Sequence, residues 1–285
     1  DTSKRMGVLA SRLAINETMK AIGAWGAKND VDIYFFHGSG GSVGRGGGSI
    51  EDQAATWPPG ASALVKQTLQ GEMVERTLAT PEILRSQVLK IAEIQHTPPE
   101  PRPVSDAAKE LGTLAEETFV DVLASGEFFD LLSGATPYTR LGTLTIGSRP
   151  VSRAAADSPT GLEQLRAIPW VLCWTQTRYL LHAWLGVGSA WRAVRGDETR
   201  RAAFVEALKV DPLLNSYVRM LGFTLAKTVP LLWREYVRAL SGDAPAILGR
   251  IEQEWEDARD LALLLSSDGE LLSYRPWLRE SIFYR

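Results

Sequence analysis

Cysteine is almost absent from this sequence of 285 residues, since Cys173 is the only one. A single cysteine excludes an internal disulfide, and the apolar run 168–174 around it predicts a buried, unreactive thiol. Long uncharged runs are also missing, because no stretch approaches the ~20 apolar residues that a membrane-spanning helix needs. We therefore expect a cytoplasmic protein with no membrane partner.

Basic residues show no excess either. The sequence has 31 Lys and Arg against 34 Asp and Glu, which gives a net charge of −3 at pH 7. Domains that bind nucleic acid usually carry a basic excess, so nucleic acid is not expected as a partner. The apolar share of 45% and the charged share of 23% exclude a disordered or fibrous chain. The sequence starts at Asp1 without an initiator Met, and we expect a piece of a longer protein.

The first half of the sequence alternates helical and irregular patterns. A short β-rich segment, 31–36, has the composition of a buried strand, and residues 60–80 are expected to include one more short strand. Apolar spacing predicts helices over about 3–28, about 81–95 and from a cap at Ser105 or Asp106 to Leu123. The last of these is expected to turn inward Leu111, Leu114, Phe119, Val122 and Leu123.

The second half is almost entirely helical in pattern. A proline-rich segment, 97–103, is expected to be an exposed linker, and residues 141–165 are expected to be irregular, with a brief strand at 144–146. Helices are predicted over about 169–195, 198–209, 213–239, 243–267 and 275–283. The sequence thus predicts a helix-rich α/β fold with few strands.

A glycine-rich loop directly follows the first expected strand. Seven of the twelve residues 37–48 are glycine, so the backbone can come close to an anion and offer it successive N–H groups. Arg45 adds a forked cation, and His37 stands where strand and loop meet. The spacing fits neither a Walker A motif nor a dinucleotide fingerprint. A flexible linker, and for His37 a purely structural hydrogen bond, are the alternatives.

Two other cations stand next to rigid backbone. Arg149 precedes Pro150, and Arg166 comes shortly before Pro169 and Trp170. Taken alone, each is more typical of a surface ion pair than of a site.

Several stretches match one family in order along the chain. They are 1–7, 36–48, 70–73, 135–137, 141–142, 146–150, 165–170, 174–178 and 183–188. Together they resemble the phosphoenolpyruvate carboxylase family, and the most specific are the glycine-rich loop and Arg166-Ala167-Ile168-Pro169-Trp170. The resemblance spans nearly the whole chain, and is weakest over about 75–130 and 190–275.

The resemblance implies a fold, a reaction and an assembly. The fold would be a modified (β/α)8 TIM-type barrel with additional helices, of which residues 1–285 would be the C-terminal portion. The reaction, of the carbon–carbon lyase class, would join phosphoenolpyruvate and bicarbonate to give oxaloacetate and phosphate, an anaplerotic step that fixes CO2. It would use Mg²⁺ (or Mn²⁺), in a homotetramer that a C4 acid inhibits by feedback.

The resemblance also implies roles for particular residues. Asp1 would be a metal ligand, Lys4 an active-site lysine and His37 a group that aids the breakdown of carboxyphosphate. Arg45 would be a further catalytic residue, a cation near the phosphate. The remaining matches are the substrate-binding residues Gly40, Gly41, Arg149 and Arg166, and two inhibitor-binding residues, Lys227 and Arg285.

The chain departs from the family pattern at several positions. Ser39 stands where the family loop has an arginine, and serine supplies neither the charge nor the fork of that side chain. His182 stands where the family usually has a proline. Because of Ser39, the alternative is a divergent relative that does not carboxylate. It would be a phosphoenolpyruvate-binding or regulatory subunit, or it would hydrolyse phosphoenolpyruvate.

Overall fold

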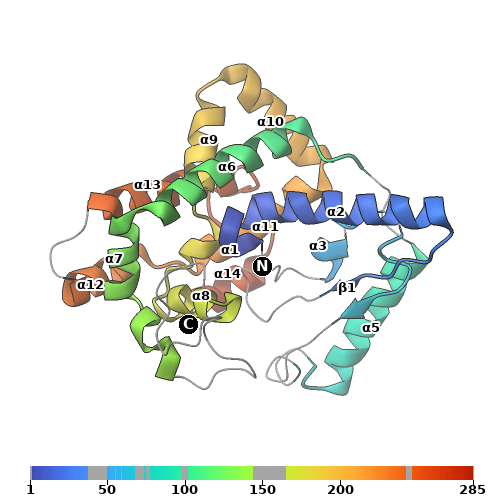
Figure 1. Cartoon of the computed structure of the whole chain (residues 1–285), viewed down its shortest axis with the longest axis horizontal. Coiled ribbons are helices and arrows are strands. Elements are labelled where there is room, and N and C mark those ends of the chain that lie inside the picture. The colour runs from blue at the N-terminus through green and yellow to red at the C-terminus, as the bar shows by residue number, and fades with distance from the viewer. Residues whose placement is uncertain are drawn as a thin grey trace.

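The computed structural model describes residues 2–37, 50–54, 56–58, 60–67, 74, 78–97, 102–143, 165–241 and 246–284. Most of these residues are helical, which confirms the helix-rich expectation (Figure 1). The elements are α1 (Ser3–Met6), α2 (Val8–Asn29), β1 (Phe36–His37), α3 (Ile50–Ala54), β2 (Lys66–Gln67), α5 (Pro81–His96), α6 (Asp106–Ala124), α7 (Gly126–Ala135), the 3₁₀ helix η2 (Pro137–Thr143), α8 (Ala167–Gln176), the 3₁₀ helix η3 (Leu181–Ala183), α9 (Val187–Arg195), α10 (Glu198–Val210), α11 (Pro212–Ala226), α12 (Pro230–Ser241), α13 (Ala246–Leu263) and α14 (Pro276–Phe283).

The predicted first helix is divided in two at Gly7. This residue has φ +78°, a conformation that glycine adopts without strain, and a Cβ atom there would lie 3.4 Å from the ring of Phe119. The chain therefore turns between α1 and α2 while it stays in contact with α6. Val8 and Leu9 are buried at the start of α2, whereas Ile15 and Ile22 farther along are exposed.

Helix α6 starts as the sequence predicts. The Ser105 hydroxyl oxygen accepts a hydrogen bond from the Ala108 amide at 3.2 Å, and Asp211 Oδ2 accepts from both the amide and the hydroxyl of Ser105, each at 2.7 Å. Asp211 Oδ1 also accepts from the Leu213 and Leu214 amides at the start of α11. One buried carboxylate thus satisfies the first turns of two helices and ties them together.

Two long helices of the prediction are interrupted. The stretch 169–195 divides into α8, η3 and α9, because Arg178 (φ +53°) and Gly186 (φ +90°) have left-handed backbone that an α-helix cannot contain. The stretch 213–239 divides into α11 and α12, because Pro230 lacks the N–H that a continuous helix would use. The predictions for α5, α10, α13 and α14 differ from the structure only near the helix ends.

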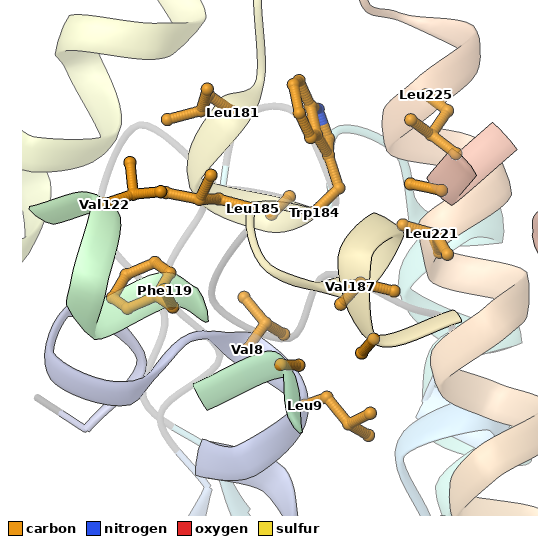
Figure 2. Packing of buried hydrophobic residues seen from close by; sticks show 14 of the residues in the cluster. Val8, Leu9, Phe119, Val122, Leu181, Trp184, Leu185, Val187, Leu221 and Leu225 are labelled. Carbon is orange, nitrogen blue, oxygen red and sulfur yellow. The ribbon is translucent and has the colours of Figure 1, made fainter. Parts of the chain in front are cut away.

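The main hydrophobic core lies where α2, α6, η3, α9 and α11 meet (Figure 2). Val8 and Leu9 of α2 lie on one side of this core with Phe119 of α6, and Leu185 lies between Val122 and Trp184. Of the five inward residues predicted for α6, Leu111, Phe119 and Val122 are buried, and Leu114 and Leu123 are partly buried against the core.

Aromatic side chains extend this core toward α8 and α12. Trp174 lies 5.5 Å from Trp170 and 5.9 Å from Trp233, measured between ring centroids. Tyr179 stacks on Trp233 at 5.0 Å and meets Trp184 edge-on at 5.2 Å. Aromatic rings at these separations attract each other, and these contacts fix the orientation of α8.

The described residues contain one small parallel ladder, in which Phe36 pairs with Lys66 and His37 with Gln67. The prediction of a buried strand over 31–36 is wrong, since only Phe36 of that segment is strand and its side chain is 72% exposed. A strand is buried when sheet neighbours and packed layers cover it, and the described part of the chain gives β1 one partner of two residues. These residues do not close a barrel.

A separate small cluster connects α3 to α5. Ile50, Ala54 and Ile94 are buried there, with Trp57 and Ile91 packed against them. In Figure 1 this pair of helices lies with β1 on the side of the molecule away from α7 and α12.

Candidate active site

One of the expected active-site cations contacts the backbone directly before another. The Lys4 ammonium group donates a hydrogen bond to the carbonyl oxygen of Leu165, which is 161 residues away in the sequence. Arg166 is the next residue along the chain. Lys4 is only 8% exposed and Leu165 is fully buried, so this contact is internal. The fold therefore brings the expected lysine against the backbone directly before Arg166, one of the three expected arginines.

The position of Lys4 follows from the turn before α2. Helix α1 is a single turn that packs against α2 and α6, and Gly7 closes it. The hydroxyl groups of Thr2 and Ser11 are 2.5 Å apart, which ties the start of α1 to the first turns of α2. These contacts hold the side chain of Lys4 toward the interior.

Arg166 is the N-cap residue of α8. Its backbone is extended (φ −76°, ψ 165°), and its carbonyl oxygen accepts from the Trp170 amide at 3.0 Å. The buried rings of Trp170 and Trp174 fix the helix that follows. Nε of Arg166 is buried and has no hydrogen-bond partner among the described residues. A buried guanidinium N–H without a protein acceptor is suited to an anionic ligand.

Most of the other expected site residues lie outside the part of the chain that the structure describes. The backbone of His37 ends β1, and its side chain and the glycine-rich segment that follows lie outside the part of the chain that the structure describes. The remaining expected residues and the Ser39 position also lie outside it: Asp1, Ser39, Gly40, Gly41, Arg45, Arg149 and Arg285.

Lys227, expected in the inhibitor site, caps the C-terminal end of α11. It is exposed, and its ammonium nitrogen lies 5.1 Å from the centroid of the Phe223 ring. The carbonyl oxygen of Arg178 accepts from the Val229 amide at 2.9 Å, so exposed Arg178 belongs to the same corner of the fold. Sequence reasoning used Arg178 only as part of a family motif, and its left-handed backbone could not be read from the residue type.

A metal site is not formed by the described residues alone. Among them, no three His, Cys, Asp or Glu side chains are grouped so that they could hold an ion. The expected ligand of Mg²⁺ or Mn²⁺, Asp1, lies outside this part of the chain.

The thiol of Cys173 takes no part in this site. It is fully buried, and burial raises the pKa of Cys173 to about 12. At neutral pH the group is therefore protonated and a poor nucleophile, as the sequence predicts.

The stretch 183–188, quoted above as a family motif, has a packing role. A Cβ atom at Gly186 would lie 2.2 Å from the Ala115 carbonyl oxygen, and one at Gly188 would lie 2.2 Å from that of Glu254. Side chains at these positions would push α9 away from α6 and α13. The two glycines thus allow the close helix contacts of the core.

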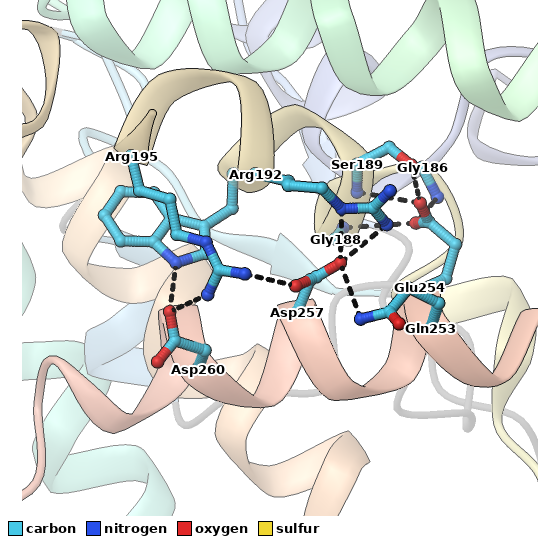
Figure 3. Close-up of polar contacts among 10 residues, drawn as sticks. Gly186, Gly188, Ser189, Arg192, Arg195, Gln253, Glu254, Asp257 and Asp260 are labelled. Carbon is cyan, nitrogen blue, oxygen red and sulfur yellow. Dashed lines mark hydrogen bonds and ion pairs between the residues drawn. The ribbon is translucent and has the colours of Figure 1, made fainter. Parts of the chain in front are cut away.

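Buried Glu254 completes this contact from α13 (Figure 3). Its carboxylate accepts from the amides of Gly186 at 2.9 Å, Gly188 at 3.2 Å and Ser189 at 2.7 Å, and from the Ser189 hydroxyl. Burial raises the pKa of Glu254, and the hydrogen bonds from Ser189 and Gly186 oppose that shift. Glu254 of α13 therefore acts as the N-terminal cap of α9.

An ion-pair network continues along the same interface (Figure 3). Asp257, which is buried, pairs with Arg192 and Arg195 at 2.6 Å, and Asp260 pairs with Arg195 at 2.6 Å. Asp260 also accepts from the indole N–H of Trp191 at 2.7 Å. These contacts stabilise the packing of α9 on α13.

No helix in the described segments combines the length and the apolar character that a bilayer crossing requires.

Comparison with known proteins places the chain in one family. The profile of the family described as phosphoenolpyruvate carboxylase matches residues 1–285. A phosphoenolpyruvate carboxylase of Chromohalobacter salexigens is 35% identical and one of Shewanella sediminis 32% identical, each over 297 residues that cover all of this chain and 33% of the relative. One of Mycobacterium leprae is 31% identical over 302 residues, again across the whole chain and 32% of the relative. The chain spans about a third of the length of these curated relatives, and it belongs to the phosphoenolpyruvate carboxylase family.

Proposed function

We propose that this chain is the C-terminal portion of an enzyme that carboxylates phosphoenolpyruvate with bicarbonate to give oxaloacetate and phosphate. The observation that carries the proposal is the internal contact between Lys4 and the backbone beside Arg166. It places Lys4 against the residue directly before Arg166, and the family resemblance assigns both of these cations to one active site. The family relationship, which covers the whole chain, supports the same reaction.

The reaction needs several fixed positive groups. Bicarbonate oxygen attacks the phosphorus of phosphoenolpyruvate, and the bond from phosphorus to the enol oxygen breaks to leave carboxyphosphate and the enolate of pyruvate. Carboxyphosphate then splits into CO2 and phosphate, and the enolate carbon bonds to CO2. Every reactant and intermediate except CO2 is an anion, so a buried ammonium and a buried guanidinium N–H lower the energy of the charged species.

Finer features of the family are part of the proposal. The barrel would be completed by segments of the parent protein outside this chain, and exposed Val31, Tyr34 and Phe36 beside β1 support a further layer there. A divalent cation, Mg²⁺ or Mn²⁺, would be held by Asp1 and by acids from those segments, and would polarise phosphoryl and carboxylate oxygens when bound. A cytoplasmic homotetramer, inhibited by a C4 acid at Lys227 and Arg285, completes the proposal.

The test is product formation by the full-length parent protein with phosphoenolpyruvate, bicarbonate and Mg²⁺. Oxaloacetate is followed with malate dehydrogenase, and phosphate release is measured in parallel. We expect equal amounts of both products, and a loss of about 10²–10³ in kcat for Lys4→Gln and Arg166→Gln. The matched controls, Lys28→Gln and Arg238→Gln, change exposed side chains and should keep the parent rate.

Ser39 makes the alternative function testable in the same assay. Phosphate released without oxaloacetate would show hydrolysis in place of carboxylation. Neither product, with phosphoenolpyruvate still bound, would identify a binding or regulatory relative. Since a forked cation stabilises transferring phosphoryl groups, Ser39→Arg is expected to raise the rate of a site that is otherwise intact.

A further inference from the structure

Three arginines gather around one carboxylate where α2, α3, α11 and the start of α14 meet. Arg275 donates from Nη2 to Asp52 Oδ2 at 2.6 Å, and Arg219 Nη1 lies 3.8 Å from Asp52 Oδ1. Arg12 of α2 interacts electrostatically with the same carboxylate. We call Arg12, Arg219, Arg275 and Asp52 the arginine cluster.

The charge of the arginine cluster is not balanced. The donors of Arg12 go to uncharged acceptors, the Ser216 hydroxyl at 3.4 Å and the Met220 sulfur at 3.2 Å. Burial lowers the pKa of Arg12, an effect of removing its charge from water, and the charge of Asp52 opposes the shift. Within the described residues, the three guanidinium groups of the cluster therefore face one carboxylate, an excess of about two positive charges.

The network between α9 and α13 shows the usual arrangement for comparison. There Arg192 and Arg195 face Asp257 and Asp260, so the number of guanidinium groups equals the number of carboxylates. A structural ion-pair network of this kind needs no ligand. The arginine cluster differs because its cations outnumber the anions that hold them.

Neighbouring contacts fix the arginine cluster in place. The hydroxyl of Tyr274 donates to the carbonyl oxygen of Arg219 at 2.7 Å, and the guanidinium of Arg219 lies 4.9 Å from the centroid of the Tyr274 ring. The Ser216 hydroxyl donates to the carbonyl oxygen of Asp52 at 2.9 Å, which joins α11 to α3. A preorganised pair of forked donors loses little freedom when it binds a ligand.

We propose that the arginine cluster binds a small phosphate-bearing dianion through Arg219 and Arg275. Their side chains are 38% and 28% exposed, so a ligand can reach them from water. Arg12 adds positive charge, and its own donors go to Ser216 and Met220. A dianion matches the excess of two charges, and its tetrahedral oxygens can accept from two guanidinium forks at once. None of these residues belongs to the proposed active site, so this proposal does not depend on the proposed reaction.

Arginine labelling of the full-length parent protein tests the proposal one side chain at a time. The protein is treated with phenylglyoxal in inorganic phosphate or in chloride of equal ionic strength, and the labelled peptides are quantified by mass spectrometry. We expect millimolar phosphate to slow the labelling of Arg219 and Arg275 about tenfold, the effect of filling most of a site. Exposed Arg238, which pairs with Glu235 on α12, is the matched control and should label equally in both salts.

Two variants separate ligand binding from a structural role. Asp52→Asn removes a competing negative charge, so we expect protection at about tenfold lower phosphate concentration. Arg275→Gln should raise the concentration needed to protect Arg219 by about tenfold. If phosphate leaves the labelling of Arg219 and Arg275 unchanged in the parent, the proposal is wrong. It is also wrong if Asp52→Asn speeds their labelling to the same extent in phosphate and in chloride.

Discussion

Replacing His182 by leucine tests how an uncharged histidine in the core affects stability. His182 lies in η3, is almost fully buried, and has no hydrogen-bond partner for either ring nitrogen among the described residues. Burial lowers the pKa of His182 from 6.5 to about 3, because the charged imidazolium would lose its hydration. In the unfolded chain the same ring is in water and takes up a proton near its ordinary pKa.

The magnitude follows from proton linkage. Above pH ~6.5 the ring is neutral in both states and His182 adds no pH dependence. As pH falls below that value the unfolded state binds a proton that the folded state excludes, so the free energy of unfolding decreases by about 1.36 kcal/mol per pH unit. The loss attributable to His182 is about 2 kcal/mol at pH ~5, and it grows toward about 5 kcal/mol near pH ~3.

Urea unfolding followed by tryptophan fluorescence between pH ~8 and ~5 measures this loss. The range stops where most carboxylates begin to titrate. The stability of His182→Leu should fall about 2 kcal/mol less than that of the parent over this range. The matched control is His96→Leu, at an exposed residue of α5, which should keep the parent slope. Parallel curves for the parent and His182→Leu would refute the assignment of a neutral histidine excluded from water.

Two further predictions concern other buried groups. Because burial raises the pKa of Cys173 to about 12, its thiol should resist a disulfide reagent at pH ~8 in the native protein and react fully in urea. Glu254→Gln should lower the free energy of unfolding by about 3 kcal/mol, since the amides at the start of α9 lose a charged acceptor. Glu256→Gln, on the exposed side of the same helix, should change it by less than about 0.5 kcal/mol, and equal losses in these two variants would contradict the capping role.

Local patterns predicted many of the helices correctly. The cap at Ser105 and the inward positions of Phe119 and Val122 follow from residue type and spacing, and both are confirmed. The positions of α5, α10 and α13 follow from apolar periodicity for the same reason. Such features depend on neighbours within a few turns of the chain, which the sequence displays directly.

Features set by distant contacts were not predictable in this way. The turn at Gly7 depends on the ring of Phe119, and the break at Gly186 depends on the backbone of Ala115. The prediction that the segment 31–36 is buried is wrong, because burial depends on layers that other parts of the structure must supply.

The candidate site also has features that the sequence predicts and features that only the fold creates. The family resemblance singled out Lys4 and Arg166, but the contact through Leu165 is a product of the fold. The arginine cluster had no sequence signal, because its members are dispersed over four elements and match no motif. The burial of His182 is likewise a product of the fold, and a histidine in an apolar stretch only suggests it.

The cap that Glu254 places on α9 has a consequence for hydrogen exchange. Opening α13 removes the acceptor of the Gly186, Gly188 and Ser189 amides in a single event, although these amides lie more than sixty residues earlier in the sequence. The two helices should therefore behave as one unit of local unfolding. Their amides would exchange with solvent at a common rate, and this shared rate would set the lifetime of the packed interface.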